Sequence, residues 1–242
     1  MPSEHPAMPK AGVDRERQVQ RLFSEIAPRY DLLNHVLSLN VDKGWRRRAV
    51  DLLDWEREAG GRFLDACAGT FDLALELSGR NGFTGRVVAS DFAQPMLREG
   101  APKLEASRVV PVCGDSLQLP FPDDAFDGAT VGFGVRNLAD LSRGLRELHR
   151  VLRPGARLVV LEFTTPPNPV VRWSYLFYFH RVLPVVGRVV SRHPWAYTYL
   201  PASVKEFPGP SRLEAMFGEA GFRGTGHRLL SLGIAALHWG VK

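Results

Sequence analysis

Three carboxylates mark the ends of three successive apolar segments of the sequence. The segments are Arg62–Ala66, Arg86–Ser90 and Arg108–Gly114, and the carboxylates are Asp65, Asp91 and Asp115. The carboxyl ends of parallel strands meet at one edge of an open α/β sheet, which is where such folds bind ligands. A single aspartate at a strand end is often only solvated, but three in order favour a site that accepts hydrogen bonds from a polar, nucleotide-like ligand.

The first segment runs into a turn of small residues. Asp65 is followed by Ala66-Cys67-Ala68-Gly69-Thr70, and the stretch Leu73–Leu77 then predicts a helix. Small side chains in such a turn let a ligand approach the backbone closely, although the same pattern also suits a plain strand-to-helix turn. Thr70 is a residue type that favours a helix N-cap. The G-x-G-x-x-G fingerprint is absent from this turn, which argues against a nicotinamide-dependent dehydrogenase.

The elements that must position these residues alternate between strand and helix from Arg62 to Phe163. Two further strands are predicted at Gly128–Phe133 and Arg157–Phe163, with a leucine-rich helix between them. This alternation indicates βαβ crossovers and a doubly wound, mostly parallel sheet. The last elements expected are a helix at Arg212–Ala220 and an antiparallel hairpin of Phe222–Leu230 with Ile234–Val241. The predicted fold class is therefore α/β.

The chain of 242 residues suits one large domain. Residues 1–13 are expected to form a disordered tail, and residues 14–242 a single domain. Helices predicted at Asp14–Ala27 and Val41–Leu53 make residues 14–60 a helical cap ahead of the first strand. Residues 164–210 are rich in proline and aromatic residues and are expected to be an insertion on the substrate side.

The composition limits the partners and the compartment. A formal net charge of +5 permits a polyanionic partner without requiring one. The densest basic run, Arg46-Arg47-Arg48, is expected to be solvated surface, with a membrane or nucleic-acid contact as the alternative. Cys67 and Cys113, expected in or beside buried strands, form no CxxC pair, which argues against a zinc site and fits a reducing cytosol. No secretory signal is visible, and polar residues interrupt Val170–Val190 too often for a membrane span.

Several longer stretches resemble the UbiE/MenG family of quinone C-methyltransferases, a branch of the class I S-adenosylmethionine-dependent methyltransferases. The resemblance covers the chain from about Phe23 to Lys242. It rests on Tyr30–Asn34 before Trp45-Arg46, Phe121–Asp127, Phe133–Asn137, Arg150–Gly155 running into Leu161-Glu162-Phe163, Tyr175–Phe179, Tyr199–Val204 with Phe207-Pro208, and Gly233–Gly240. The stretches Phe121–Asp127 and Arg150–Gly155 recur across many class I methyltransferases and alone identify only the superfamily.

The resemblance implies a seven-stranded class I methyltransferase sheet and S-adenosylmethionine as the cofactor, with no metal. It implies that Thr70 contacts the methionine part of the cofactor, that Asp91 binds the ribose hydroxyls, and that Asp115 and Ser116 flank the adenine. A charged acceptor such as Asp91 suits a diol, because charge-assisted hydrogen bonds are the stronger ones. The remaining expected cofactor-binding residues are Asp65, Gly69 and Gly132.

Two residues depart from the pattern of the family. Phe71 stands where the family has a glycine that lets the cofactor approach closely. We expect the Phe71 side chain to pack inward rather than to narrow the pocket. Gly132 stands where the family often has a serine, which removes one possible hydrogen bond and leaves a backbone contact.

The reaction implied by the resemblance is methylation of a ring carbon of a polyprenyl quinol, converting demethylmenaquinol to menaquinol. A ring carbon becomes nucleophilic when the neighbouring hydroxyl loses a proton, so the substrate should be the reduced quinol. The expected substrate-binding residues are Tyr30, Arg136, Asn137, Tyr178 and Tyr199, with Arg136 and Asn137 as oxyanion stabilisers. The sequence does not select a general base among Tyr30, His180, His193, Tyr197 and Tyr199.

The apolar run Trp173–Phe179 is expected to line a groove for the prenyl tail, with an ordinary buried helix as the alternative. Basic residues around it suit an anionic bilayer surface; they are Arg172, Arg181, Arg188 and Arg192. We therefore expect a cytoplasmic protein that contacts the inner face of the membrane transiently. The sequence gives no indication of the oligomeric state.

Three other functions compete with this reaction. Ring methylation of the methoxy-benzoquinol intermediate of ubiquinone biosynthesis uses the same motifs. A non-catalytic quinone or lipid carrier would follow if Phe71 blocked the cofactor site. A nucleic-acid methyltransferase is disfavoured, and no nucleic-acid partner is expected, because the chain has no Asn/Asp-Pro-Pro-aromatic tetrapeptide and no recognisable RNA-binding module.

Overall fold

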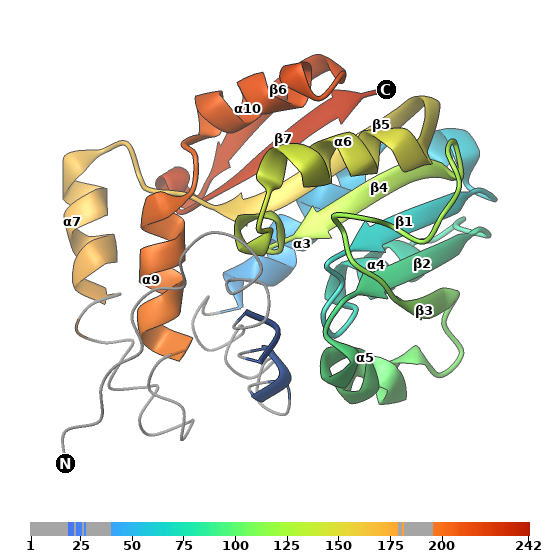
Figure 1. Cartoon of the computed structure of the whole chain (residues 1–242). Coiled ribbons are helices and arrows are strands. Elements are labelled where there is room, and N and C mark those ends of the chain that lie inside the picture. The colour runs from blue at the N-terminus through green and yellow to red at the C-terminus, as the bar shows by residue number, and fades with distance from the viewer. Residues whose placement is uncertain (1–18, 22, 26, 28–39, 179–180, 182–195) are drawn as a thin grey trace.

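Seven strands form one sheet in the computed structural model, which describes residues 19–21, 23–25, 27, 40–178, 181 and 196–242 (Figure 1). The strand order is β3-β2-β1-β4-β5-β7-β6. The strands are β1 (Arg62–Ala66), β2 (Arg86–Asp91), β3 (Val109–Cys113), β4 (Phe126–Gly132), β5 (Leu152–Phe163), β6 (Arg223–Leu230) and β7 (Ala235–Val241). Neighbours from β3 to β5 are parallel, and β7 is antiparallel to β5 and β6. The predicted α/β sheet with an antiparallel C-terminal pair is confirmed.

Helices cover both faces of this sheet (Figure 1). The longer ones are α3 (Val41–Leu52), α4 (Asp72–Ser78), α5 (Gln94–Gly100), α6 (Leu141–Val151), α7 (Pro169–Phe177), α9 (Ala196–Glu206) and α10 (Pro210–Glu219). Short 3-10 turns are η2 (Trp55–Glu58), η3 (Ala101–Leu104), η4 (Val135–Asn137) and η6 (Ser231–Gly233).

The alternation of side chains along β5 explains the two layers. Val159 and Leu161 belong to the core on the α3 and α4 side, whereas Leu158 and Val160 belong to the core on the α6 and α10 side. Successive strand residues point to opposite faces, so a continuous apolar run such as Leu158–Leu161 is buried on both.

The order of strands also locates the site. Connections from β1 run outward to β2 and β3, whereas β4 and β5 lie on the other side of β1. The crevice at the carboxyl ends of the strands beside such a reversal is the place where open α/β sheets bind ligands. Helices α7 and α9 lie beyond this end of the sheet (Figure 1).

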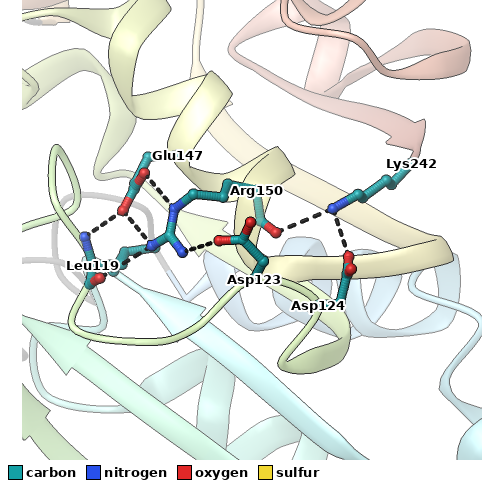
Figure 2. A network of polar contacts seen from close by, with 6 residues as sticks. All are labelled: Leu119, Asp123, Asp124, Glu147, Arg150 and Lys242. Atoms are coloured by element: carbon teal, nitrogen blue, oxygen red, sulfur yellow. Dashed lines mark hydrogen bonds and ion pairs between the residues drawn. The ribbon is translucent and has the colours of Figure 1, made fainter.

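Arg150, in the last turn of α6, joins the stretches Phe121–Asp127 and Arg150–Gly155 (Figure 2). Its guanidinium donates to the Asp123 carboxylate at 2.6 Å and to both oxygens of Glu147 at 2.7 and 2.9 Å. Glu147 in turn accepts the backbone N–H of Leu119 at 2.8 Å, and the bonds from Arg150 lower the pKa of Glu147. None of these residues lines the cleft described below. The network therefore has a structural role: it fixes the segment that precedes β4 against α6.

Some predicted details differ in the structure. Cys113, expected in or beside a buried strand, is exposed because β3 is an edge strand. The leucines that predict the helix before Arg157 run from Leu138 to Leu152, but α6 is shorter. The Asp140 side chain caps α6 by accepting the Arg143 N–H, and β5 already begins at Leu152. Residues 19–21 and 23–25 are helical, and the rest of the predicted helix at 14–27, other than Ala27, lies outside the described residues.

Helix α3, part of the predicted helical cap, packs against the sheet as one of the helices that cover it. Trp45, Ala49 and Val50 of α3 are buried in the core shared with α4 and the sheet. In the described part of the chain, no helix combines the length and apolar character needed to cross a membrane.

Candidate functional site

A cleft lies along the carboxyl ends of β1, β2 and β4, and it has two lobes. The Asp91 lobe is lined by Asp91, Asp115 and Ser116 together with the apolar side chains of Phe92, Met96, Leu117 and Leu138. The Thr70 lobe is lined by Thr70, Asp65, Asp72 and Arg46. Both lobes share Cys67, Gly69, Gly132 and Phe133, so they form one continuous cleft.

Asp91 braces the turn after β1. Its Oδ2 accepts the backbone N–H of Gly69 at 2.9 Å, and its Oδ1 accepts that of Ala93 at 2.8 Å. Gly69 has a φ of 54°, a left-handed conformation that glycine adopts without a steric penalty. Burial raises the pKa of Asp91, and the two backbone hydrogen bonds oppose this rise. A carboxylate has about four lone-pair sites, so both oxygens can still accept a hydrogen bond from a ligand diol.

Asp65 lines the Thr70 lobe and joins three elements. This β1 residue accepts the hydroxyl of Thr130 on β4 at 2.8 Å and the backbone N–H of Ala74 on α4 at 3.1 Å. Its side chain is buried, and this burial raises the pKa of Asp65 to about 7. Its charge therefore changes near neutral pH and responds to a cation in the lobe.

Phe71 packs inward, as expected from the sequence. The residue has a φ of 73°, yet its side chain is fully buried in the core and lines neither lobe. The ring lies against Gly100 of α5, where a Cβ atom would come within 2.6 Å of it. Phe71 therefore does not block the cleft. The hypothesis of a non-catalytic carrier required such a block, so it loses its support.

Gly132 ends β4 at the junction of the two lobes. A Cβ atom at this position would lie 2.6 Å from Leu73 Cδ1, so a side chain here would require Leu73 to move. In the Asp91 lobe, Ser116 Oγ lies 3.4 Å from Cys67 Sγ, and burial raises the pKa of the Cys67 thiol to about 12. Cys67 is therefore a neutral thiol at physiological pH. Among the residues that the structure describes, no three histidine, cysteine or acidic side chains are grouped to hold a metal ion.

The predicted substrate residues fall into different places. Asn137 lines the Asp91 lobe, and its Oδ1 accepts the Tyr199 hydroxyl of α9 at 2.9 Å. Arg136 turns away into a buried ion pair with Glu162 at 2.6 Å, and Tyr178 is half-buried beside α7 with its pKa raised by burial. Neither Arg136 nor Tyr178 lines the cleft. Tyr30, His180, His193 and the side chain of Tyr197 lie outside the described residues.

The apolar run on α7 does not line the cleft, and most of it is not buried. Trp173 and Phe177 stack on each other with ring centroids 5.7 Å apart, and they are 70% and 52% exposed. Val170, one turn earlier, is 75% exposed, whereas Tyr175 is buried. These positions place Val170, Trp173 and Phe177 on one face of the helix at spacings of three and four residues. Composition alone could not distinguish a groove from such an exposed face.

Arg46 and Phe133 were not predicted as site residues. Phe133, with a φ of 58°, follows β4 and lines both lobes, and the Arg46 guanidinium lies 5.9 Å from its ring centroid. Arg46 is buried although it belongs to a run of three arginines. The helical spacing of the apolar residues could have predicted this burial. Positions 42, 45, 46, 49, 50 and 53 form one buried stripe, and Arg46 lies in it.

Comparison with known proteins decides the family. The profile of the ubiE/COQ5 methyltransferase family matches residues 11–242. The chain belongs to this family. The demethylmenaquinone methyltransferase of Thermus thermophilus is 51% identical over 223 residues, covering 91% of this chain and 100% of that protein. The ubiquinone/menaquinone biosynthesis C-methyltransferase UbiE of Geobacter sulfurreducens is 43% identical over 233 residues, covering 95% and 90%.

The fold has similar solved structures as well. A methyltransferase of Thermotoga maritima, described as S-adenosylmethionine-dependent and a possible histamine N-methyltransferase, superposes with a TM-score of 0.64. The two chains are 18% identical, with 93% and 99% covered, so this likeness concerns the fold alone. Membership of the ubiE/COQ5 family confirms the resemblance seen in the sequence and the predicted enzyme class, a methyltransferase that uses S-adenosylmethionine.

Proposed function

We propose that this member of the ubiE/COQ5 family methylates a ring carbon of demethylmenaquinol to give menaquinol. The observation that carries the proposal is the 51% identity with the demethylmenaquinone methyltransferase of Thermus thermophilus, which extends over the whole of that protein. The name of the Geobacter relative includes ubiquinone biosynthesis, so the methoxy-benzoquinol intermediate is the rival acceptor.

The cleft fits S-adenosylmethionine. We assign Asp91 to the ribose hydroxyls, because both oxygens of this buried carboxylate are fixed by backbone N–H groups beside the cleft. We assign Asp115 and Ser116, which lie next to the apolar wall of the Asp91 lobe, to the adenine. We assign Thr70 and Asp65 of the other lobe to the methionine part, and Gly69 and Gly132, which both lobes share, to the region between. When bound, the cofactor supplies a methyl group activated by its positively charged sulfur.

On the substrate side, we assign Asn137 and Tyr199 to the quinol hydroxyl. Their hydrogen bond joins η4 to α9 at the edge of the Asp91 lobe. Glu162 accepts both the guanidinium and the backbone N–H of Arg136, so the buried pair holds the turn that carries Asn137. Arg136 then acts on the substrate through the position of Asn137. The methyl group moves from the sulfonium sulfur to the ring carbon, and the ring hydrogen leaves as a proton. Ionisation of the neighbouring hydroxyl makes this carbon nucleophilic, so a hydrogen bond that favours the ionised hydroxyl promotes the transfer.

The redox state of the acceptor tests this function. We expect methylation of short-chain demethylmenaquinone only after dithionite reduction under anaerobic conditions, because only the quinol can ionise and donate electron density to the ring. Transfer of a radioactive methyl group measures the rate, and the reduced methoxy-benzoquinol serves as the competing acceptor. Equal rates with quinone and quinol would contradict the mechanism, and faster methylation of the benzoquinol would assign the chain to the rival acceptor.

We also propose that α7 contacts the inner surface of the cytoplasmic membrane, where a polyprenyl quinol resides. The exposed face of Val170, Trp173 and Phe177 supplies apolar area of the kind that enters a lipid interface. Residues 164–210 contain five basic residues, Arg172, Arg181, Arg188, Arg192 and Lys205, against one acidic residue, Glu206. Such an excess of positive charge is attracted to anionic lipid headgroups.

Vesicle binding tests the membrane contact. We expect the double variant Trp173→Ser and Phe177→Ser to bind phosphatidylglycerol-containing vesicles at least about tenfold more weakly in co-flotation, because burial of one large apolar side chain contributes about 1.5–3 kcal/mol. Val110→Ser, which changes an exposed residue of the edge strand β3, is the matched control and should bind as wild type. Equal flotation of the double variant and the control would exclude α7 as the contact.

A further inference from the structure

Arg46 is a buried cation at the cleft. It lies on α3, is 6% exposed, and lines the Thr70 lobe together with Asp65. Of the described residues that line this lobe, Arg46 carries the one positive charge, whereas Asp65 and Asp72 are acids. An anionic group that enters the lobe therefore has a single cationic partner among its walls.

The surroundings of Arg46 fix its orientation. Its guanidinium forms ion pairs with Asp42 one turn earlier on α3 and with Asp72 of α4 at 3.0 Å. Asp72 is shared with Lys103, whose ammonium lies 3.1 Å from the other carboxylate oxygen and also donates to the Thr70 carbonyl at 3.2 Å. A planar guanidinium has five N–H donors in a rigid fork, so one held by two acids is preorganised to bind a further anion. It loses little side-chain entropy in doing so.

The methionine part of S-adenosylmethionine carries one α-carboxylate and one α-ammonium group. The Thr70 lobe offers the Arg46 guanidinium for the carboxylate and the Asp65 carboxyl for the ammonium. The second acid of the lobe, Asp72, is already paired with Arg46 and Lys103. We propose that Arg46 binds the carboxylate of the methionine part and is thereby a cofactor-binding residue supplied by the N-terminal section of the chain. The inference rests on the proposed function, because it assumes that this cofactor occupies the cleft.

A pair of ligands that differ only in the carboxylate tests the inference. S-adenosylmethionine and its decarboxylated analogue are titrated calorimetrically into the wild type, Arg46→Gln and the control Arg47→Gln, which changes the exposed next residue of α3. Arg46→Gln should bind S-adenosylmethionine roughly 10- to 100-fold more weakly, the scale of a lost hydrogen bond to a charged group. Its affinity for the decarboxylated analogue should match that of the wild type, and Arg47→Gln should leave both affinities unchanged.

Arg46→Lys keeps the test decisive if the glutamine variant does not fold once Asp42 and Asp72 lose their partner. The lysine variant retains the charge without the planar fork, so it should lose affinity selectively for the ligand that has the carboxylate. The role of Arg46 would be contradicted by either of two results in the folded Arg46 variants. One is an equal loss of affinity for both ligands, and the other is an unchanged affinity for S-adenosylmethionine. A wild type that binds neither ligand would contradict the proposed function itself.

Discussion

Replacing Asp91 by alanine is expected to weaken S-adenosylmethionine binding by about 2 kcal/mol, roughly 30-fold, the scale of hydrogen bonds to a charged acceptor. The change removes the carboxylate that we assign to the ribose diol. It also removes the acceptor of the Gly69 N–H, which fixes the turn between the two lobes. Both losses weaken binding, so calorimetric titration should detect the change clearly.

Control variants and thermal unfolding test whether the loss of affinity is specific to Asp91. Asp91→Asn keeps one side-chain oxygen and should lose less affinity than Asp91→Ala. Asp51→Ala removes an acid of α3 that pairs with Arg80 outside the lining of the cleft, and its affinity should remain that of the wild type. Thermal unfolding identifies variants that have lost the fold, because the N–H groups of Gly69 and Ala93 lose their acceptor in Asp91→Ala. Unchanged affinity in a folded Asp91→Ala protein would remove Asp91 from the site.

The sequence predicted most of the fold, because the parallel sheet leaves a strong pattern. Strands such as Leu158–Leu161 are buried on both faces, so they appear as continuous apolar runs between helical stretches. Parallel strands bring the acids at their carboxyl ends to the same edge of the sheet, so the sequence also predicted that these acids lie close together. Asp65, Asp91 and Asp115 do line one cleft. The same pattern does not reveal the order of the strands in the sheet. Cys113 was therefore expected in or beside a buried strand, although β3 is an edge strand.

The site was harder to predict where a side chain could point in two directions. Arg46 was grouped with its basic neighbours, although the apolar stripe of α3 places it on the buried face. Arg136 was expected at the substrate, but its partner Glu162 lies in β5, 26 residues away, and local sequence does not reveal such a pair. The apolar run of α7 had the composition of a buried helix, and only the tertiary structure leaves its Val170, Trp173 and Phe177 face exposed.

The stability of Phe71 variants tests whether the Phe71 side chain packs into the core or points into the cleft. Phe71→Ala should lower the free energy of unfolding by about 3–5 kcal/mol, because it truncates a fully buried phenylalanine and leaves a cavity beside Gly100. Alanine retains the unfavourable left-handed backbone at φ 73°, whereas glycine relieves it at a gain of roughly 1–2 kcal/mol. Phe71→Gly should therefore lose less stability than Phe71→Ala. Its free energy of unfolding should fall by about 1–4 kcal/mol, which at this chain length lowers the melting temperature by roughly 2–16 °C.

The affinity of the same variants for the cofactor completes the argument. The Phe71 ring lines neither lobe, so both variants should bind S-adenosylmethionine within about threefold of the wild type, as expected for a substitution without a ligand contact. Chemical denaturation and calorimetric titration of the three proteins measure the two quantities independently. Tighter binding by Phe71→Gly at an unchanged melting temperature would mean that the ring intrudes on the cleft. The family's glycine would then serve the cofactor directly, whereas inward packing means that this chain supports the same turn with a core side chain.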